Sequence, residues 1–208
     1  SIADDAVESE HLNDNIISGQ TALTAEPADT DEFLVSDAGT LKRIDYSLIK
    51  GGGKIGQVVQ DTKTDTFSTS SGANSPAALT GLSVAITPSA TSSKILVMVN
   101  IGFVSQSGAN HGSFFLQRGG SNIFVGDAAS NRPRATFGYG DHYNDWVGSS
   151  VSCCYLDSPS STSEQTYSVA VGGNGSATMY INRSHRDNDG TAEDGRQAST
   201  ITVMEVLA

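Results

Sequence analysis

The sequence predicts an all-β protein, a jelly-roll-like antiparallel β-sandwich preceded by an acidic segment of different character. Two observations predict the sandwich. Short β-branched runs recur along the chain, and turn residues separate them, among 22 glycines and abundant Ser and Thr. After residue 53, no stretch has the helical 3.6-residue apolar period. Hydrophobic residues make up 37% of the chain, and 208 residues suffice for one domain of ordinary size plus an appendage.

The longest apolar run, residues 93–104 (SKILVMVNIGFV), is the strand around which we expect the sandwich to form. Leu96 and Met98 point to one side of this strand. The opposite side carries Ile95, Val97, Val99, Ile101 and Phe103. A strand that is apolar on both faces does not leave one face in water, so it belongs at the centre of a sheet. We expect a second layer, or another subunit, to cover its second face.

The three glycines at positions 51–53 mark the predicted boundary between residues 1–53 and residues 54–208, because such a run is too costly in entropy inside a helix or strand. Charge changes there as well. Residues 1–50 hold 11 acidic and 3 basic residues, a net of −8, and residues 51–208 hold 12 and 9, a net of −3. An acidic chain repels phosphate, so we expect no nucleic-acid partner. No apolar run is long enough for membrane insertion.

The N-terminal segment has two predicted elements. Residues 2–17 read as a short helix with acidic residues in its first turn, where the helix dipole favours them. Its apolar stripe is thin, so we expect it to be ordered only when three copies pack together. Residues 33–44 read as a small hairpin that turns at residues 37–39, where Gly39 supplies a positive φ. The segment has little core of its own, which suits a shaft or an attachment piece.

Eight to ten short strands are expected after residue 53, at the spacing of a sandwich or barrel. The expected strands are residues 55–60, 82–86, 93–104, 114–116, 122–125, 146–156, 167–171, 179–181 and 200–206. Three longer connections stand out, residues 105–112, 126–145 and 183–198. Cys153 and Cys154 are adjacent and therefore point to opposite faces of a strand, so we expect two small apolar side chains rather than a disulfide or metal site.

Several motifs resemble virion structural proteins of tailed bacteriophages, notably marine ones. Residues 28–49 (ADTDEFLVSDAGTLKRIDYSLI) resemble a segment of tail fibres. The later motifs resemble the C-terminal domain of such proteins: TDTFSTSS (64–71), LSVAITPSATSSKILVMV (82–99), LQRGGSNI (116–123), LDSPSSTSEQTYSV (156–169), YINRS (180–184) and STITVMEV (199–206). The resemblance implies a homotrimeric β-sandwich head, comparable to tumour necrosis factor-like and complement-type globular heads, with TVMEV as its closing strand.

Two of the long connections carry the candidate receptor-contact residues. Aromatic rings stack on sugars or anchor protein contacts, and the neighbouring polar groups bind hydroxyls. The candidates in and just after residues 126–145 are Arg132, Arg134, Tyr139, His142, Tyr143 and Trp146. Tyr143 and Trp146 could instead begin a strand and belong to the core. The candidates in residues 183–198 are His185, Arg186, Asp187 and Asp189.

Catalytic and cofactor motifs are not found in the sequence, and we expect no enzyme, no cofactor and no metal. The four histidines are far apart in sequence and read as solvated. Residues 185–196 resemble a calcium loop in composition, but Arg196 stands where the EF-hand spacing requires Glu. Two close carboxylate pairs could serve glycoside hydrolysis, Asp141 with Asp145 and Asp187 with Asp189. Both pairs lie in loops that look flexible, which hold catalytic geometry poorly.

Three functions therefore stand as hypotheses. The first is a tail-fibre-type adhesin in which residues 1–53 bind other virion proteins and the trimeric head contacts a host surface glycan or protein. The second is a capsid decoration or head-fibre protein. The third is a polysaccharide depolymerase, which the carboxylate pairs alone support. All three place the protein in the virion, on the tail or on the capsid surface.

Overall fold

The computed structural model describes residues 18–50, 54–107, 111–140, 147–175, 177–190 and 192–207. It is 51% strand and 5% helical, so the all-β prediction is confirmed. The chain divides into two compact units, Ser1–Gly51 and Gly52–Ala208, and this division falls within the three-glycine run. The helix expected over residues 2–17 lies outside the described residues.

The first unit contains the predicted hairpin. Strands β1 (Glu32–Asp37) and β2 (Thr40–Asp45) pair antiparallel, and helix α2 (Tyr46–Ile49) follows them. The turn residues Ala38 and Gly39 have φ values of 51° and 84°. A two-residue turn with positive φ at both positions has the twist that matches a hairpin. The sequence therefore predicted both the hairpin and its turn.

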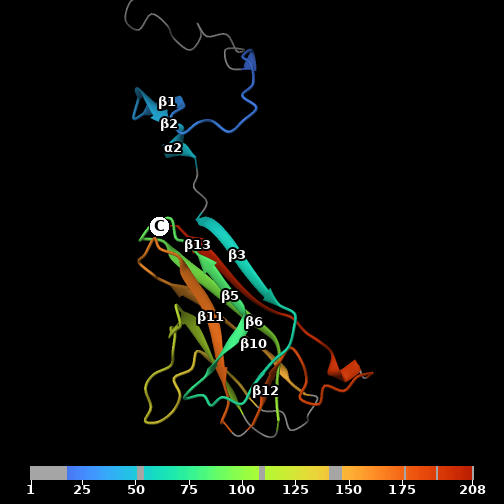
Figure 1. Ribbon diagram of the computed structural model, residues 1–208. Coiled ribbons are helices and arrows are strands. Elements are labelled where there is room, and N and C mark those ends of the chain that lie inside the picture. The colour runs from blue at the N-terminus through green and yellow to red at the C-terminus, as the bar shows by residue number, and fades with distance from the viewer. Residues whose placement is uncertain are drawn as a thin grey trace, which may run out of the picture. The chain divides into compact units, whose positions relative to one another are not determined.

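The second unit contains two antiparallel sheets, which together form a sandwich (Figure 1). The first sheet consists of β3 (Ile55–Lys63), β13 (Ser199–Val206), β6 (Lys94–Gln106), β12 (Met179–Ile181) and β4 (Phe67–Thr69), with β10 (Ser149–Asp157) on the other edge of β6. The second sheet consists of β5 (Ala77–Ile86), β11 (Gln165–Gly172), β7 (Gly112–Arg118) and β8 (Ser121–Asn122), with β9 (Phe137–Tyr139) also paired to β7.

The strand order is that of a jelly roll. If the short strands β4, β8 and β12 are set aside and the equally short β9 is kept, the strands run β3-β13-β6-β10 in one sheet and β5-β11-β7-β9 in the other. Numbered along the chain, these orders are 1-8-3-6 and 2-7-4-5, the double Greek key. The long-range pairing of β13 between β3 and β6 closes the first sheet with the last strand of the chain.

The predicted central strand is β6, which pairs with β13 and β12 on one edge and β10 on the other. Its first half alternates as predicted, with Ile95 and Val97 in the core and Met98 on the outer face. Phe103 was expected to face the core with them. Instead, Phe103 is half-buried and Val104 is fully buried, because the register with β10 shifts between Val104 and Ile101.

Gly102 explains where this shift falls. A Cβ on Gly102 would lie 2.1 Å from the carbonyl oxygen of Ala198, so only glycine allows the chain to approach so closely before β13 begins. The Gly102 N–H donates to the Ser199 hydroxyl at 3.1 Å. The inward phase of β6 thus changes at a residue that is in close contact with a segment about a hundred positions away.

The core between the sheets consists of side chains from both layers, among them Val97 and Ile201 from the first sheet and Phe114, Leu116 and Tyr167 from the second. The Tyr167 hydroxyl donates to Asp157 at 2.7 Å, and burial together with this bond raises the pKa of Tyr167.

The adjacent cysteines differ from the prediction of two buried side chains. Cys153 is half-buried, and burial raises its thiol pKa to about 11, whereas Cys154 is exposed on the outer face.

Candidate functional site

The candidate site lies at one end of the sandwich, which we call the loop end. The chain enters the sandwich at the opposite end. There the N–H of Leu207 donates to the carbonyl of Lys54 at 2.8 Å, so the start of the first strand lies beside the end of the last strand. Strand β6 runs from there to the end where β12 lies (Figure 1). We define the loop end by three segments, residues 72–74, 173–174 and 182–198.

Asn182 anchors the longest of these segments, the connection from β12 to β13. It is fully buried and has a φ of 62°. Its side-chain amide donates to the carbonyls of Lys63 at 2.9 Å and Asp65 at 3.1 Å. Its side-chain oxygen accepts a hydrogen bond of 2.6 Å from Ser199. Its backbone N–H donates to the carbonyl of Phe103 at 2.9 Å. One side chain thus ties the start of the loop to strand ends on both sides.

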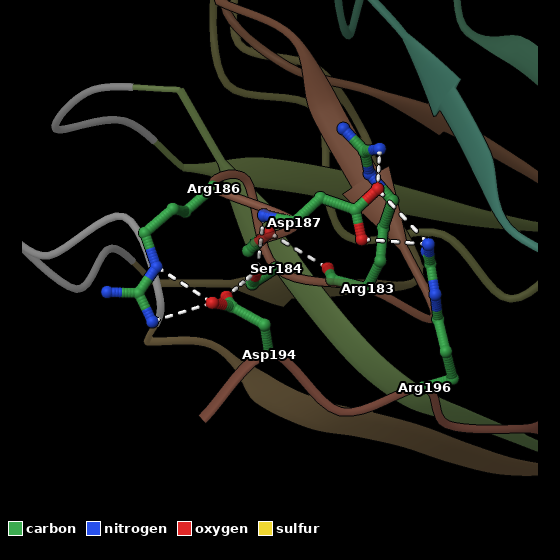
Figure 2. Close-up of polar contacts among 7 residues, drawn as sticks. Arg183, Ser184, Arg186, Asp187, Asp194 and Arg196 are labelled. Atoms are coloured by element: carbon green, nitrogen blue, oxygen red, sulfur yellow. Dashed lines mark hydrogen bonds and ion pairs between the residues drawn. The ribbon is translucent and has the colours of Figure 1, made fainter. Parts of the chain in front are cut away.

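Ion pairs fix the remainder of this loop (Figure 2). Asp187 accepts from Arg183 at 2.5 Å and from Arg196 at 2.9 Å. Arg186 donates to Asp194 at 2.6 Å, and the Asp194 side chain has no exposed surface. A single exposed ion pair contributes little to stability, but a network that shares its members holds one geometry.

The hydroxyl of Ser184 joins the two halves of this network. It donates to the buried Asp194 carboxylate and accepts from the backbone N–H of Asp187 at 2.9 Å. Much of this loop is exposed to solvent, but its charged side chains also bind one another. The three arginines of this stretch are paired with two of its aspartates, Asp187 and Asp194.

Three candidate residues from the sequence, His185, Arg186 and Asp187, take unexpected roles here. His185 stacks on Tyr180, with ring centroids 5.2 Å apart, and Arg183 lies 4.4 Å from the centroid of the same ring. His185 is thus part of a cation–aromatic stack and is not simply a solvated side chain. Arg186 and Asp187 belong to the ion-pair network, and Asp189 is exposed next to it.

The other candidate loop is only partly described. Arg132 and Arg134 are exposed, and Arg134 donates to the carbonyl of Gly126 at 2.7 Å. Tyr139 was predicted as a contact residue within a loop. It lies instead in β9, is 3% exposed and belongs to the core, so its ring is not available for stacking on a ligand. His142, Tyr143 and Trp146 lie outside the described residues, as do Asp141 and Asp145.

The carboxylates of the described loop are engaged with arginines rather than with one another. Asp187 faces two guanidinium groups, and Asp194 faces one. Within the described residues, no three His, Cys, Asp or Glu side chains come together as metal ligands. The calcium-like composition of residues 185–196 therefore corresponds, in its described part, to an ion-pair network.

A polar cavity at the loop end was missed by the sequence analysis. It measures about 240 Å³, and the residues that line it are Gly72, Ala73, Asn74, His111, Ser113, Pro133, Gly173 and Asn174. They come from four separate segments, so no local motif could predict it. The available signal was the run Gly172–Gly175, which reads only as a turn until its partner at Gly72 is known.

Comparison with known proteins adds no identification. No protein-family model matches this chain, and no curated protein matches it either. In the part of the chain that the structure describes, no helix is long and apolar enough to span a membrane.

Proposed function

We propose that this protein is a virion structural protein of a tailed bacteriophage, a tail-fibre-type adhesin whose trimeric β-sandwich contacts the host surface through its loop end. The observation that carries the proposal is the ion-pair network of residues 183–196. It fixes a charged loop in one shape at the end of the sandwich opposite to chain entry. Binding surfaces need such preorganised side chains. The motif resemblance points to the same class of protein.

The outer face of the first sheet supports the trimer. Three rows of side chains cross strands β10, β6, β13 and β3 in register. The rows are Leu156, Leu96, Met204 and Val58; Cys154, Met98, Thr202 and Gln60; and Ser152, Asn100, Thr200 and Thr62. None of these twelve residues is charged, although the chain carries a net charge of −11. Copies of this chain can therefore pack on this face without charge repulsion.

The same face is hollowed and partly apolar. A shallow groove of about 450 Å³ runs between β10, β6 and β13, with Met98, Cys154 and Thr202 in its lining. Leu156 and Val58 are exposed beside it. We propose that two further copies of this chain cover the face in a threefold assembly, which gives Leu96 and Met98 the second layer that their apolar character requires.

The first unit supports a role in attachment to other virion proteins. Its large apolar residues are mostly exposed, with Leu34 at 76%, Leu41 at 70% and Leu48 at 74%. The basic residues of its hairpin are already paired within the unit, Lys42 with Asp37 and Arg43 with Glu32. We propose that protein partners in the virion bind this unit chiefly through apolar contacts.

Immunogold labelling of particles tests the assignment to the tail. Antibodies raised against residues 54–208 are expected to label the tail of the phage that carries this protein, seen by negative-stain electron microscopy. Labelling of the head would establish the decoration or head-fibre alternative. Antibodies against the major capsid protein serve as the control for head labelling. If purified particles carried no label although the antibodies recognise the protein in lysates, the virion assignment would be wrong.

A further inference from the structure

We propose that the polar cavity at the loop end binds one unit of a neutral saccharide. This inference rests on the proposed function, because it assigns a ligand class to the end of the sandwich that is to contact the host. The cavity is separate from the ion-pair network: the residues that line it come from segments 72–74, 111–113 and 173–174 together with Pro133.

The chemistry of the wall selects a neutral, polar ligand. Amide, hydroxyl and imidazole groups line it, contributed by Asn74, Ser113, His111 and Asn174, and among the described residues no Asp, Glu, Lys or Arg lines it. A charged ligand would lose hydration without meeting an opposite charge. An apolar ligand would leave the wall's donors and acceptors without partners. A polyol offers hydroxyls that both donate and accept, so it matches side chains of both kinds.

The size of the cavity limits the ligand to one ring. Its volume of about 240 Å³ is below the range of about 300–1,000 Å³ that holds drug-sized molecules. Pro133 adds an apolar surface to the otherwise polar lining. A single monosaccharide unit, free or at the end of a glycan, has both the size and the mixture of polar and apolar surface that this wall accepts.

The cavity is also firmly built. The N–H of Ala73 donates to the carbonyl of Gly173 at 2.7 Å, and the N–H of Gly173 donates to the carbonyl of Ser71 at 2.8 Å. A Cβ on Gly172 would lie 2.6 Å from the carbonyl oxygen of Gly72, so the two segments approach more closely than any side chain would permit. A floor held by main-chain hydrogen bonds is preorganised for a ligand.

Gln106 is a further buried polar residue beside this floor. It is 5% exposed, and neither its side-chain nitrogen nor its side-chain oxygen has a hydrogen-bond partner. Its amide nitrogen lies 2.7 Å from where a Cβ on Gly173 would stand. Buried amides are ordinarily satisfied. Gln106 is not among the residues that line the cavity, so its amide is a buried polar group behind Gly173, at a place suited to a water molecule.

Binding of free sugars to the full-length protein tests the proposal. The probes are glucose, galactose, mannose and N-acetylglucosamine, with glucuronate as the anionic comparison, measured by saturation-transfer NMR and calorimetry. At least one neutral sugar is expected to bind saturably with a Kd on the order of 1 mM, as the small number of ligand atoms permits. Glucuronate is expected to bind at least about tenfold more weakly, because its charge has no partner in the wall.

Two variants assign the binding to this cavity. Asn74→Ala and His111→Ala change exposed side chains of the lining and are each expected to weaken sugar binding about tenfold without lowering the thermal midpoint. Asn122→Ala is the matched control. It removes an exposed amide from the β7–β8 hairpin, bonded to Gln117 and remote from the cavity lining, and should leave the Kd unchanged.

Three results would overturn the inference: no saturable binding of any of the four neutral sugars up to about 50 mM, equal binding of glucuronate, or unchanged affinity in both lining variants. These outcomes are distinguishable from a failure of the proposed function. Sugar binding together with gold label on the head would support the proposal that the cavity binds a sugar and contradict the assignment to the tail. Label on the tail without sugar binding would support the adhesin proposal and contradict the proposal that the cavity binds a sugar.

Discussion

Replacing Asn182 with alanine is expected to cost about 3–4 kcal/mol in the free energy of unfolding, the largest effect we predict for a single site. The substitution leaves the carbonyl of Lys63 and the hydroxyl of Ser199 without their partner in a buried place, and also removes the part-buried bond to the Asp65 carbonyl. It also puts alanine at a φ of 62°, which asparagine tolerates better. Urea unfolding should show a lower midpoint with an unchanged slope.

Two companion variants separate the causes. Asn182→Gly keeps the backbone free to adopt positive φ but removes the same hydrogen bonds, so it should lose nearly as much stability as alanine. Asn122→Ala makes the same chemical change at an exposed hairpin and should cost less than about 0.5 kcal/mol. A loss below about 1 kcal/mol for Asn182→Ala would show that the buried anchor does not hold the loop as described.

Replacing Glu205 with glutamine is expected to cost about 2–3 kcal/mol at pH 7 and to flatten the acid dependence of stability. Glu205 is 1% exposed and accepts hydrogen bonds of 2.6 Å from both the N–H and the hydroxyl of Ser89, and one of 2.7 Å from Gln57. Burial by itself would raise the pKa of Glu205, but these bonds lower it from 4.5 to about 2.

The sign of the pH effect follows from this shift. Because the pKa of Glu205 is lower in the folded state than in the unfolded state, its contribution to stability is complete above pH 4.5 and is lost as the pH falls towards 2. The stability difference between the wild type and Glu205→Gln should therefore shrink over this window in urea titrations. Glu164→Gln, at an exposed position, is the control and should leave the pH profile unchanged. A constant difference from pH 7 to pH 2 would contradict the assigned role.

The parts of the fold that depend on local patterns could be predicted from the sequence. Alternation and β-branched content predicted strand β6, and the dipeptide at Ala38 and Gly39 predicted the hairpin turn. The change of phase at Phe103 could not be predicted. It depends on the close approach of Ala198 to Gly102, a contact that exists only after β13 has paired.

The candidate site was predicted less well, for the same physical reason. The sequence singled out the connection around Asp187, but it did not predict that the charges there pair with one another, because pairing is a matter of three-dimensional geometry. Tyr139 looked like a loop aromatic because β9 has only three residues and no periodicity of its own. The sugar-sized cavity combines four distant segments, so Gly173 and His111 carry no signal of it separately.

The mass of the full-length protein in solution tests the central claim most directly, since the proposed trimer would supply both the cover for the outer sheet face and the threefold head. Light scattering at micromolar concentration is expected to give three times the 21.6 kDa of the chain. Leu96→Glu, which places a charge within the three uncharged rows, is expected to reduce this mass to that of one chain while the β-sheet circular dichroism remains. A wild-type protein that stays at 21.6 kDa would contradict the trimeric adhesin.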